Sequence, residues 1–224
     1  MNRRVGIGMM AAVAAMALTG CGGPVYIYRY RLTIEVDTPQ GLKSGSSVIE
    51  TTVQDDTESW GPREARLVRS TTKGEAVFVD LGSSRQVIAL LAMGPSGVDD
   101  PDFTNLVPTL FQRRALEEMR SWQERKGQFT LPSNLVPTLV TFADLNDPNT
   151  ARVLRPDELE AVLGPGVQFR RAWIEMTGDP VTRGVEKKLP WLAGFKGYSG
   201  GQLHPDWLRP EKNLTGSQFI KGAS

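Results

Sequence analysis

Cysteine and histidine are almost absent from this sequence of 224 residues, which contains only Cys21 and His204. A single cysteine excludes an intrachain disulfide, so the fold must be held together by packing. The counts also exclude zinc sites built from cysteine and histidine, and a Cys/His catalytic pair in any usual arrangement. The sequence therefore assigns no catalytic residue, no metal site and no cofactor.

An excess of charge of either sign is missing as well. The formal net charge is +1, and Arg3 and Arg4 lie in the N-terminal leader, so residues 21–224 hold 24 basic and 25 acidic residues. Proteins that bind nucleic acid carry a basic patch or excess, so we expect no nucleic-acid partner. The 40% hydrophobic and 23% charged residues are ordinary for a globular protein, and the length allows one domain with a real core.

The longest apolar run lies at the N-terminus and is too short to span a bilayer comfortably. A basic start, Met1–Arg4, precedes the 15 residues Val5–Thr19, which are rich in Ala, Met and Gly. A membrane-spanning helix needs about 20 such residues. Basic start and short apolar core together are typical of a secretory signal peptide.

The four residues that close this leader are Leu18-Thr19-Gly20-Cys21. They resemble the lipobox of bacterial lipoproteins, in which a branched apolar residue, a small residue and Gly or Ala precede a cysteine. The resemblance covers residues 1–21. It implies that the Cys21 thiol is modified with a diacylglycerol, that the signal peptide, residues 1–20, is then removed, and that the new amine of Cys21 often receives a fatty acid such as palmitate. Two or three acyl chains make a lasting anchor, whereas one is marginal. The alternative is an ordinary cleaved signal with a chance cysteine.

A lipidated Cys21 would place the protein in the cell envelope, facing the periplasm. Residues 21–24 form the lipidated residue and a tether, whose three residues Gly22–Pro24 span at most ~10 Å. We expect the following domain to be held against the membrane surface. Gly22 is not the aspartate that retains lipoproteins in the inner membrane of some enteric bacteria, so both the inner and the outer membrane stay open.

Strand patterns dominate residues 25–193, which we predict to be a single α+β domain. From Val25 to Val36 apolar and polar residues alternate, and the predicted buried face consists of Tyr26, Tyr28, Tyr30, Leu32, Ile34 and Val36. This period of two marks a strand with one buried side. Further strands are predicted at 47–53, after a longish loop from 38 to 46, and at 66–68, 76–81, 86–92, 139–143 and 169–177. The sheet is expected to be mostly antiparallel and twisted.

One long helix is predicted over 106–126, with an apolar side formed by Phe111, Ala115, Leu116, Met119 and Trp122. Arg–Glu pairs four residues apart would form its outward face. Pro156-Asp157-Glu158 predicts a short second helix that ends at Gly164, and 181–188 predict one or two further helical turns. These helices are expected to pack on the sheet.

Glycine and proline recur without a usable period near the C-terminus. We therefore expect residues 194–224 to be an irregular, partly disordered tail. Aromatic side chains on such loops often grip a sugar or a partner protein. Tyr198 and Trp207 are the candidate binding residues, whereas Trp191 and Phe195 are expected to cover the sheet.

Three catalytic or metal-binding motifs were weighed. Ser70-Thr71-Thr72-Lys73 has the Ser-x-x-Lys spacing of β-lactamases and penicillin-binding proteins, but their Lys-Thr-Gly follows the nucleophile, whereas Lys43-Ser44-Gly45 precedes Ser70. A Ser-His-Asp hydrolase would need His204 from the irregular tail, and we expect no Gly-x-Ser-x-Gly nucleophile elbow. The Asp-rich turn 144–149 lacks the Gly and Glu of a calcium loop, so its aspartates are expected to cap turns.

We expect a non-catalytic envelope lipoprotein with a binding or structural role at the membrane surface. Its partners would be the membrane, through the N-terminal lipid, and an envelope protein or glycan. The alternative is a lipid-anchored hydrolase that acts on cell wall or lipid.

Overall fold

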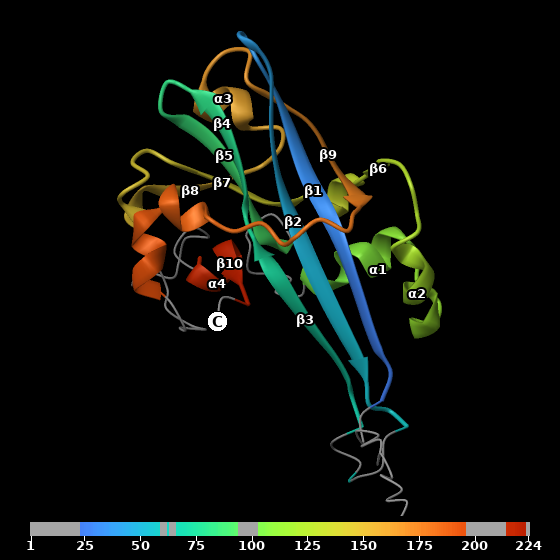
Figure 1. Cartoon of the computed structure of the whole chain (residues 1–224). Helices are drawn as coiled ribbons and strands as arrows, with labels where there is room; N and C mark the ends of the chain where they lie inside the picture. The colour runs from blue at the N-terminus through green and yellow to red at the C-terminus, as the bar shows by residue number, and fades with distance from the viewer. Residues whose placement is uncertain (1–22, 59–61, 63–65, 94–102, 196–213, 223–224) are drawn as a thin grey trace, which may run out of the picture.

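The computed structural model describes residues 23–58, 62, 66–93, 103–195 and 214–222. Most of them belong to two antiparallel sheets (Figure 1). The larger sheet has the order β10-β3-β2-β1-β9-β6, and the smaller has the order β4-β5-β7-β8. The prediction of a mostly antiparallel sheet with helices packed on it is confirmed in this general form.

The longest strands, β1 (Val25–Thr38) and β2 (Gly41–Asp55), form a hairpin that is paired along its whole length. The strand from Val25 and its predicted buried face are confirmed, because all six listed side chains are buried. The longish loop expected from 38 to 46 is wrong. Only Pro39 and Gln40 separate the strands, since Gly41 has a φ of +105° and the Thr38 hydroxyl donates to its carbonyl at 2.7 Å. Pairing with β1 overrides the weak strand propensity of 43–46.

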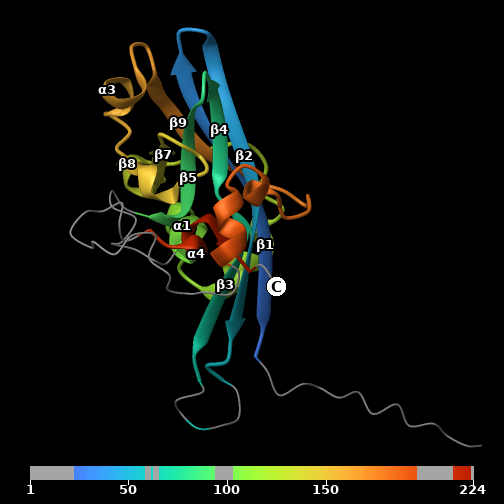
Figure 2. The same ribbon diagram turned by 90° about the vertical axis from the view of Figure 1, so that its left-hand side faces the viewer.

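Two further strands flank this hairpin. β3 (Val68–Glu75) pairs with β2, and β9 (Gln168–Met176) pairs with β1. The short β6 (Phe129–Thr130) extends β9 on one side, and β10 (Ile220–Lys221) extends β3 on the other. In both views, β1, β2 and β3 continue as a three-stranded ribbon beyond the rest of the described body (Figures 1 and 2).

The smaller sheet begins where β3 ends. Ala76 alone separates β3 from β4 (Val77–Gly82), so one bent run of chain passes from one sheet to the other. β4 forms a hairpin with β5 (Arg85–Met93), and β7 (Pro137–Phe142) and β8 (Ala151–Leu154) complete the sheet. The predicted hairpin and the strand near 139–143 are confirmed, whereas β8 was not predicted.

Hydrophobic side chains form two layers, one on each face of β5. Val87, Ala89 and Leu91 belong to the core between the sheets, which also holds the buried face of β1. Ile88 and Leu90 belong to a second cluster on the far face. That cluster is covered by the 3₁₀ helices η6 (Val185–Lys187) and η7 (Pro190–Phe195) and by α4 (Gly216–Phe219). The prediction that this strand is central and covered on both faces is confirmed.

The long helix expected over 106–126 is wrong. The chain forms η2 (Phe103–Asn105) and α1 (Leu106–Leu110), reverses at Gln112, whose φ is +52°, and resumes as η3 (Leu116–Glu118) and α2 (Met119–Trp122). Phe111 lies edge-on to Trp122 and to Phe129, with ring centroids 5.4 and 5.0 Å apart. Packing of these rings outweighs the helical pattern, because surface charge pairs stabilise a helix by only a few tenths of a kcal/mol each.

The remaining helices are short. α3 (Leu159–Leu163) confirms the predicted helix and ends at Gly164, where φ is +105°. Among the described residues, η4 (Ser133–Leu135) and η5 (Pro148–Thr150) are further 3₁₀ turns. The prediction of an irregular tail over 194–224 is wrong for residues 214–222. A Thr215/Gln218 capping box begins α4, and the side chains of Leu214 and Phe219 are fully buried.

Candidate functional site

The chain enters the fold at the free end of the three-stranded ribbon. Cys21 and its lipobox residues Leu18, Thr19 and Gly20 lie outside the described residues. Gly23, two residues after Cys21, is held at once: its N–H donates to Oδ1 of Asp56 at 3.1 Å. A Cβ at this position would lie 1.6 Å from the carbonyl oxygen of Asp55, so only glycine fits. The anchor predicted from the sequence is therefore followed almost directly by fixed structure.

Asp56 is the centre of this attachment. Its side chain is buried and accepts from Gly23, from Nε2 of Gln54 at 3.0 Å and from Nη1 of Arg69 at 2.7 Å. The backbone N–H of Gly23, followed by the Gln54 amide, holds the pKa of Asp56 below its usual value. One carboxylate thus ties the entering chain to the ends of β2 and β3.

Exposed apolar side chains gather at the same end. The described large hydrophobic residues with the highest exposure are Val25 (54%), Ile27 (58%), Leu42 (52%), Leu67 (52%) and Val68 (44%). Four of these, Val25, Ile27, Leu67 and Val68, belong to the end at which the chain enters, and we call them the ribbon tip. Leu42 lies beside the β1–β2 turn at the opposite end. The ribbon tip was not predicted, although Val25 and Ile27 among the alternating tyrosines make both faces of this end apolar.

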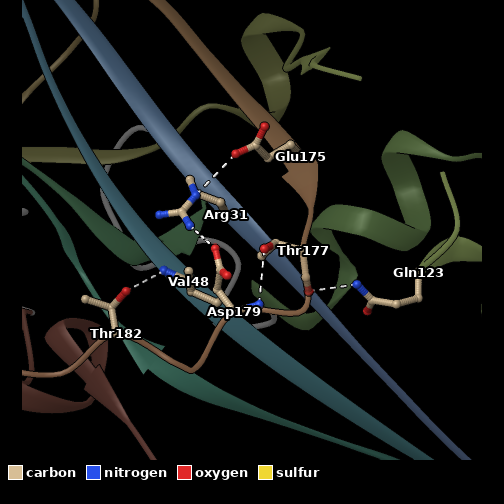
Figure 3. A network of polar contacts seen from close by, with 7 residues as sticks. All are labelled: Arg31, Val48, Gln123, Glu175, Thr177, Asp179 and Thr182. Carbon is tan, nitrogen blue, oxygen red and sulfur yellow. Dashed lines mark hydrogen bonds and ion pairs between the residues drawn. The ribbon is translucent and has the colours of Figure 1, made fainter. Parts of the chain in front are cut away.

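The other distinctive surface is the outer face of β1 and β2, which the segment 177–184 crosses after β9 ends (Figure 3). Arg31 points outward from β1 and pairs with Glu175, at 3.2 Å, and with Asp179. Further along, Thr182 pairs with β2: its N–H donates to the Val48 carbonyl at 3.1 Å, and its hydroxyl accepts from the Val48 N–H at 2.8 Å. The crossing segment thus buries Val48 on an otherwise polar face.

Gln123 fixes the start of the crossing segment. Its side-chain oxygen accepts from the backbone N–H of Arg29 at 2.9 Å. Its amide donates to the Thr177 carbonyl at 2.7 Å (Figure 3). A residue just after α2 therefore bridges β1 and the end of β9. Sequence reasoning missed this role, because nothing local marks Gln123 among its polar neighbours.

The charged residues of the same face pair with one another. Glu50 on β2 pairs with Arg29 at 2.7 Å and with Lys73 at 3.6 Å. The Glu35 carboxylate accepts a hydrogen bond from the Arg171 guanidinium at 2.8 Å and another from the indole N–H of Trp173 at 3.3 Å. The hydrogen bond from Arg171 holds the pKa of Glu35 below its usual value. These pairs cover the polar face, and the lowered pKa of Glu35 does not suit a general acid.

Glu75 is the described carboxyl group whose pKa is raised, because burial disfavours its charge. It accepts from the Val185 backbone N–H at 2.9 Å, at the start of η6. Glu75 therefore attaches the end of the crossing segment to the end of β3. This contact is structural, since it satisfies a buried backbone donor.

Neither the Ser-x-x-Lys motif nor the Asp-rich turn forms a catalytic or metal site. Ser70 and Lys73 lie on β3, three residues apart, so their side chains point to opposite faces of the sheet. Asp144 and Asp147 accept from the backbone N–H groups of Asn146 and Asn149, which confirms that they cap turns. Within the described ranges, no group of three or more His, Cys, Asp or Glu side chains is placed to hold a metal ion.

The aromatic residues near the C-terminus divide into two groups. Trp191 covers the smaller sheet as expected, with its ring 5.3 Å from that of Phe219 and its N–H donating to the Leu145 carbonyl. Tyr198 and Trp207, the candidate binding residues, and His204 lie outside the described residues.

The expectation that this sequence has no Gly-x-Ser-x-Gly motif is wrong. Gly197-Tyr198-Ser199-Gly200-Gly201 has the Gly-x-Ser-x-Gly spacing of hydrolase nucleophile elbows. It also lies outside the described residues. A nucleophile elbow follows a strand, whereas the described element before this motif is the 3₁₀ helix η7.

The comparisons with known proteins add no identification. No protein-family model, no curated protein and no solved structure matches this sequence significantly. Among the described residues, none of the helices has the length and hydropathy needed to span a membrane.

Proposed function

We propose that this chain is a non-catalytic envelope lipoprotein, anchored in the membrane through acyl chains on Cys21, whose folded domain has a binding or structural role at the membrane surface. The observation that carries the proposal is the position of Gly23. The described residues begin two positions after Cys21, at the free end of a ribbon that projects from the body, and Gly23 is already hydrogen-bonded there. An anchor at this place would hold the ribbon end at the lipid and the two-sheet body away from it.

The polar face supports a structural or binding role over catalysis. Arg29, Arg31 and Arg171 are each paired with carboxylates, which lowers their freedom to act on a substrate. The partner expected for such a domain is an envelope protein or a glycan. Tyr198 and Trp207 are the residues we propose for that contact.

Substitution of the cysteine tests the anchor. Cells expressing the full chain, with its leader, are supplied with a labelled fatty acid, and their membranes are then separated. The label should enter the native protein, whereas Cys21→Ser should carry no label and leave the membrane fraction. Since Cys21 precedes the first described residue, the variant domain should fold normally, as urea unfolding checks. Unchanged processing and membrane attachment of Cys21→Ser would refute the proposal.

Crosslinking tests the binding role. The lipidated protein, captured from a detergent extract after crosslinking, should recover a specific envelope protein or glycan. Tyr198→Ala and Trp207→Ala should reduce the recovery, whereas Tyr26→Phe, a buried residue, should not. In contrast, labelling of Ser199 by a serine-reactive fluorophosphonate would favour the hydrolase over a non-catalytic role.

A further inference from the structure

The ribbon tip carries apolar side chains on both faces of one end. Val25 and Ile27 lie two residues apart on the outer face of β1, opposite Gln54 and Thr52. Val68 pairs with Asp55, one position along from Gln54, so its side chain points to the other face. A flat protein partner would cover one face of a sheet. Apolar groups on both faces suit an environment that surrounds the end of the ribbon.

The extent of the ribbon tip matches shallow insertion into lipid. From Val25 to Ile27 the strand rises about 7 Å, which is within the ~5–10 Å depth of interfacial elements. The next residue on this face is Arg29, which is paired with Glu50. On this face of β1, the first charged side chain therefore follows Ile27, at the depth where insertion would have to stop.

The position at which the chain enters the fold indicates that the environment around the ribbon tip is lipid. Gly23 is fixed at the ribbon tip, and the two residues back to Cys21 span at most ~7 Å. We propose that the ribbon tip inserts into the surface of the lipid bilayer as a second membrane contact beside the acyl anchor, and so holds the ribbon upright. This inference rests on the proposed function for the tether. Arg69 at this end is paired with Asp56. Residues 55–69 hold four acidic and three basic residues, so we do not expect the contact to depend on anionic lipid.

The test replaces the acyl anchor, so that its outcome is independent of lipidation in cells. Residues 21–224, with Cys21→Ser and an N-terminal hexahistidine, are bound to phosphatidylcholine vesicles that contain a nickel-chelating lipid. A single cysteine is introduced as Ile27→Cys or, as matched control, Leu42→Cys, and labelled with an environment-sensitive fluorophore. Ile27 and Leu42 are similarly exposed but lie at opposite ends of the β1–β2 hairpin.

On vesicles the emission from position 27 should shift to the blue and be quenched by spin-labelled lipid, while emission from position 42 should not change. Adding anionic phosphatidylglycerol should leave both results unaltered. Val25→Asp together with Val68→Asp should abolish the shift at position 27, since charged groups do not enter lipid. Urea unfolding checks that this double variant remains folded; if it does not, Leu67→Asp serves instead.

Three results would overturn the inference: no shift at position 27 on vesicles, an equal shift at position 42, or a shift that follows protein concentration without vesicles. The last would make the ribbon tip an interface between copies of this chain. Each of these results is compatible with lipidation of Cys21 in cells, so the inference can fail while the proposed anchor holds. Conversely, a shift at position 27 alone supports the ribbon tip even where the labelled fatty acid fails to enter the protein.

Discussion

Gly23 and Asp56 are joined by a hydrogen bond of 3.1 Å, although 33 positions separate them in the chain. The same carboxylate accepts from Gln54 and Arg69. Because Gly23 is the first described residue, this contact decides where and in which direction the preceding chain leaves the fold. The relation between anchor and body therefore depends on one side chain.

Replacing Asp56 should loosen the entry of the chain. Asp56→Asn removes the charge that strengthens the hydrogen bond from Gly23, so the amides of residues 23–27 should exchange with deuterium faster than in the native protein. Asp55→Asn is the matched control, because the Asp55 side chain accepts from Thr57. Equal exchange at residues 23–27 in both variants would contradict this role of Asp56.

The pH dependence of this attachment follows from the lowered pKa of Asp56. A carboxyl group with a lower pKa in the folded state stabilises the fold above its unfolded pKa, near 3.9. That stabilisation is lost as the pH falls through the folded pKa. Exchange at Gly23 should therefore speed up, relative to Asp56→Asn, only below about pH 4. If exchange at Gly23 relative to Asp56→Asn instead changed near neutral pH, the Asp56 carboxylate would not be the group responsible.

Thr182 should hold the crossing segment on the sheet. Thr182→Ala leaves the N–H of the buried Val48 without its acceptor and should lower the free energy of unfolding by about 1–3 kcal/mol. Thr182→Ser retains the hydroxyl and should restore most of this loss. Urea unfolding of the three proteins provides the comparison, and equal stability of the Ala and Ser variants would show that the hydroxyl does not matter.

Trp122 should stabilise the broken helical region. Its side chain is fully buried and lies edge-on to Tyr28, with ring centroids 5.2 Å apart. Trp122→Ala should lower the free energy of unfolding by about 3–5 kcal/mol. The exposed Leu42→Ala should change it by less than about 0.5 kcal/mol. A loss at Trp122 no larger than at Leu42 would mean that the aromatic contacts do not outweigh the helical pattern.

Glu75 should make stability fall with rising pH over a limited range. Its pKa is raised by burial, so between about pH 4.3 and its folded pKa the folded state holds more protons than the unfolded state. The free energy of unfolding contributed by this group falls as the pH rises through that range. Glu75→Gln removes the effect and retains an acceptor for Val185, so its stability relative to the native protein should increase with pH.

The Glu75 measurement is a series of urea unfolding curves from pH 4 upward. Carboxyl groups with lowered pKa values, such as Glu35 and Asp56, act in the opposite direction. Their contribution cancels in the difference between Glu75→Gln and the native protein. The exposed Glu117→Gln is the control for the chemical change itself. An advantage of Glu75→Gln that shrinks as the pH rises would contradict the sign.

Elements with a strong local pattern were predictable from sequence alone. The alternation from Val25 to Val36 specifies a strand and its buried face, because side chains two residues apart must share one side of the sheet. The Pro39–Gly41 reversal and the Gly164 helix end follow from the backbone angles that these residues favour. The leader and lipobox are read in the same local way, and the anchor at Cys21 stays a prediction.

Features that depend on distant partners were decided by the tertiary structure. The packing of Phe111 against Trp122 outweighs the helical pattern of 106–126. α4 and β10 form where the Phe219 side chain packs in the second core cluster. Thr182 meets Val48 across 134 positions, and Gly23 meets Asp56 across 33. Local propensity is worth a few tenths of a kcal/mol per residue, whereas burying one large side chain is worth ~1.5–3 kcal/mol. Where the two disagree, the long-range contact determines the structure.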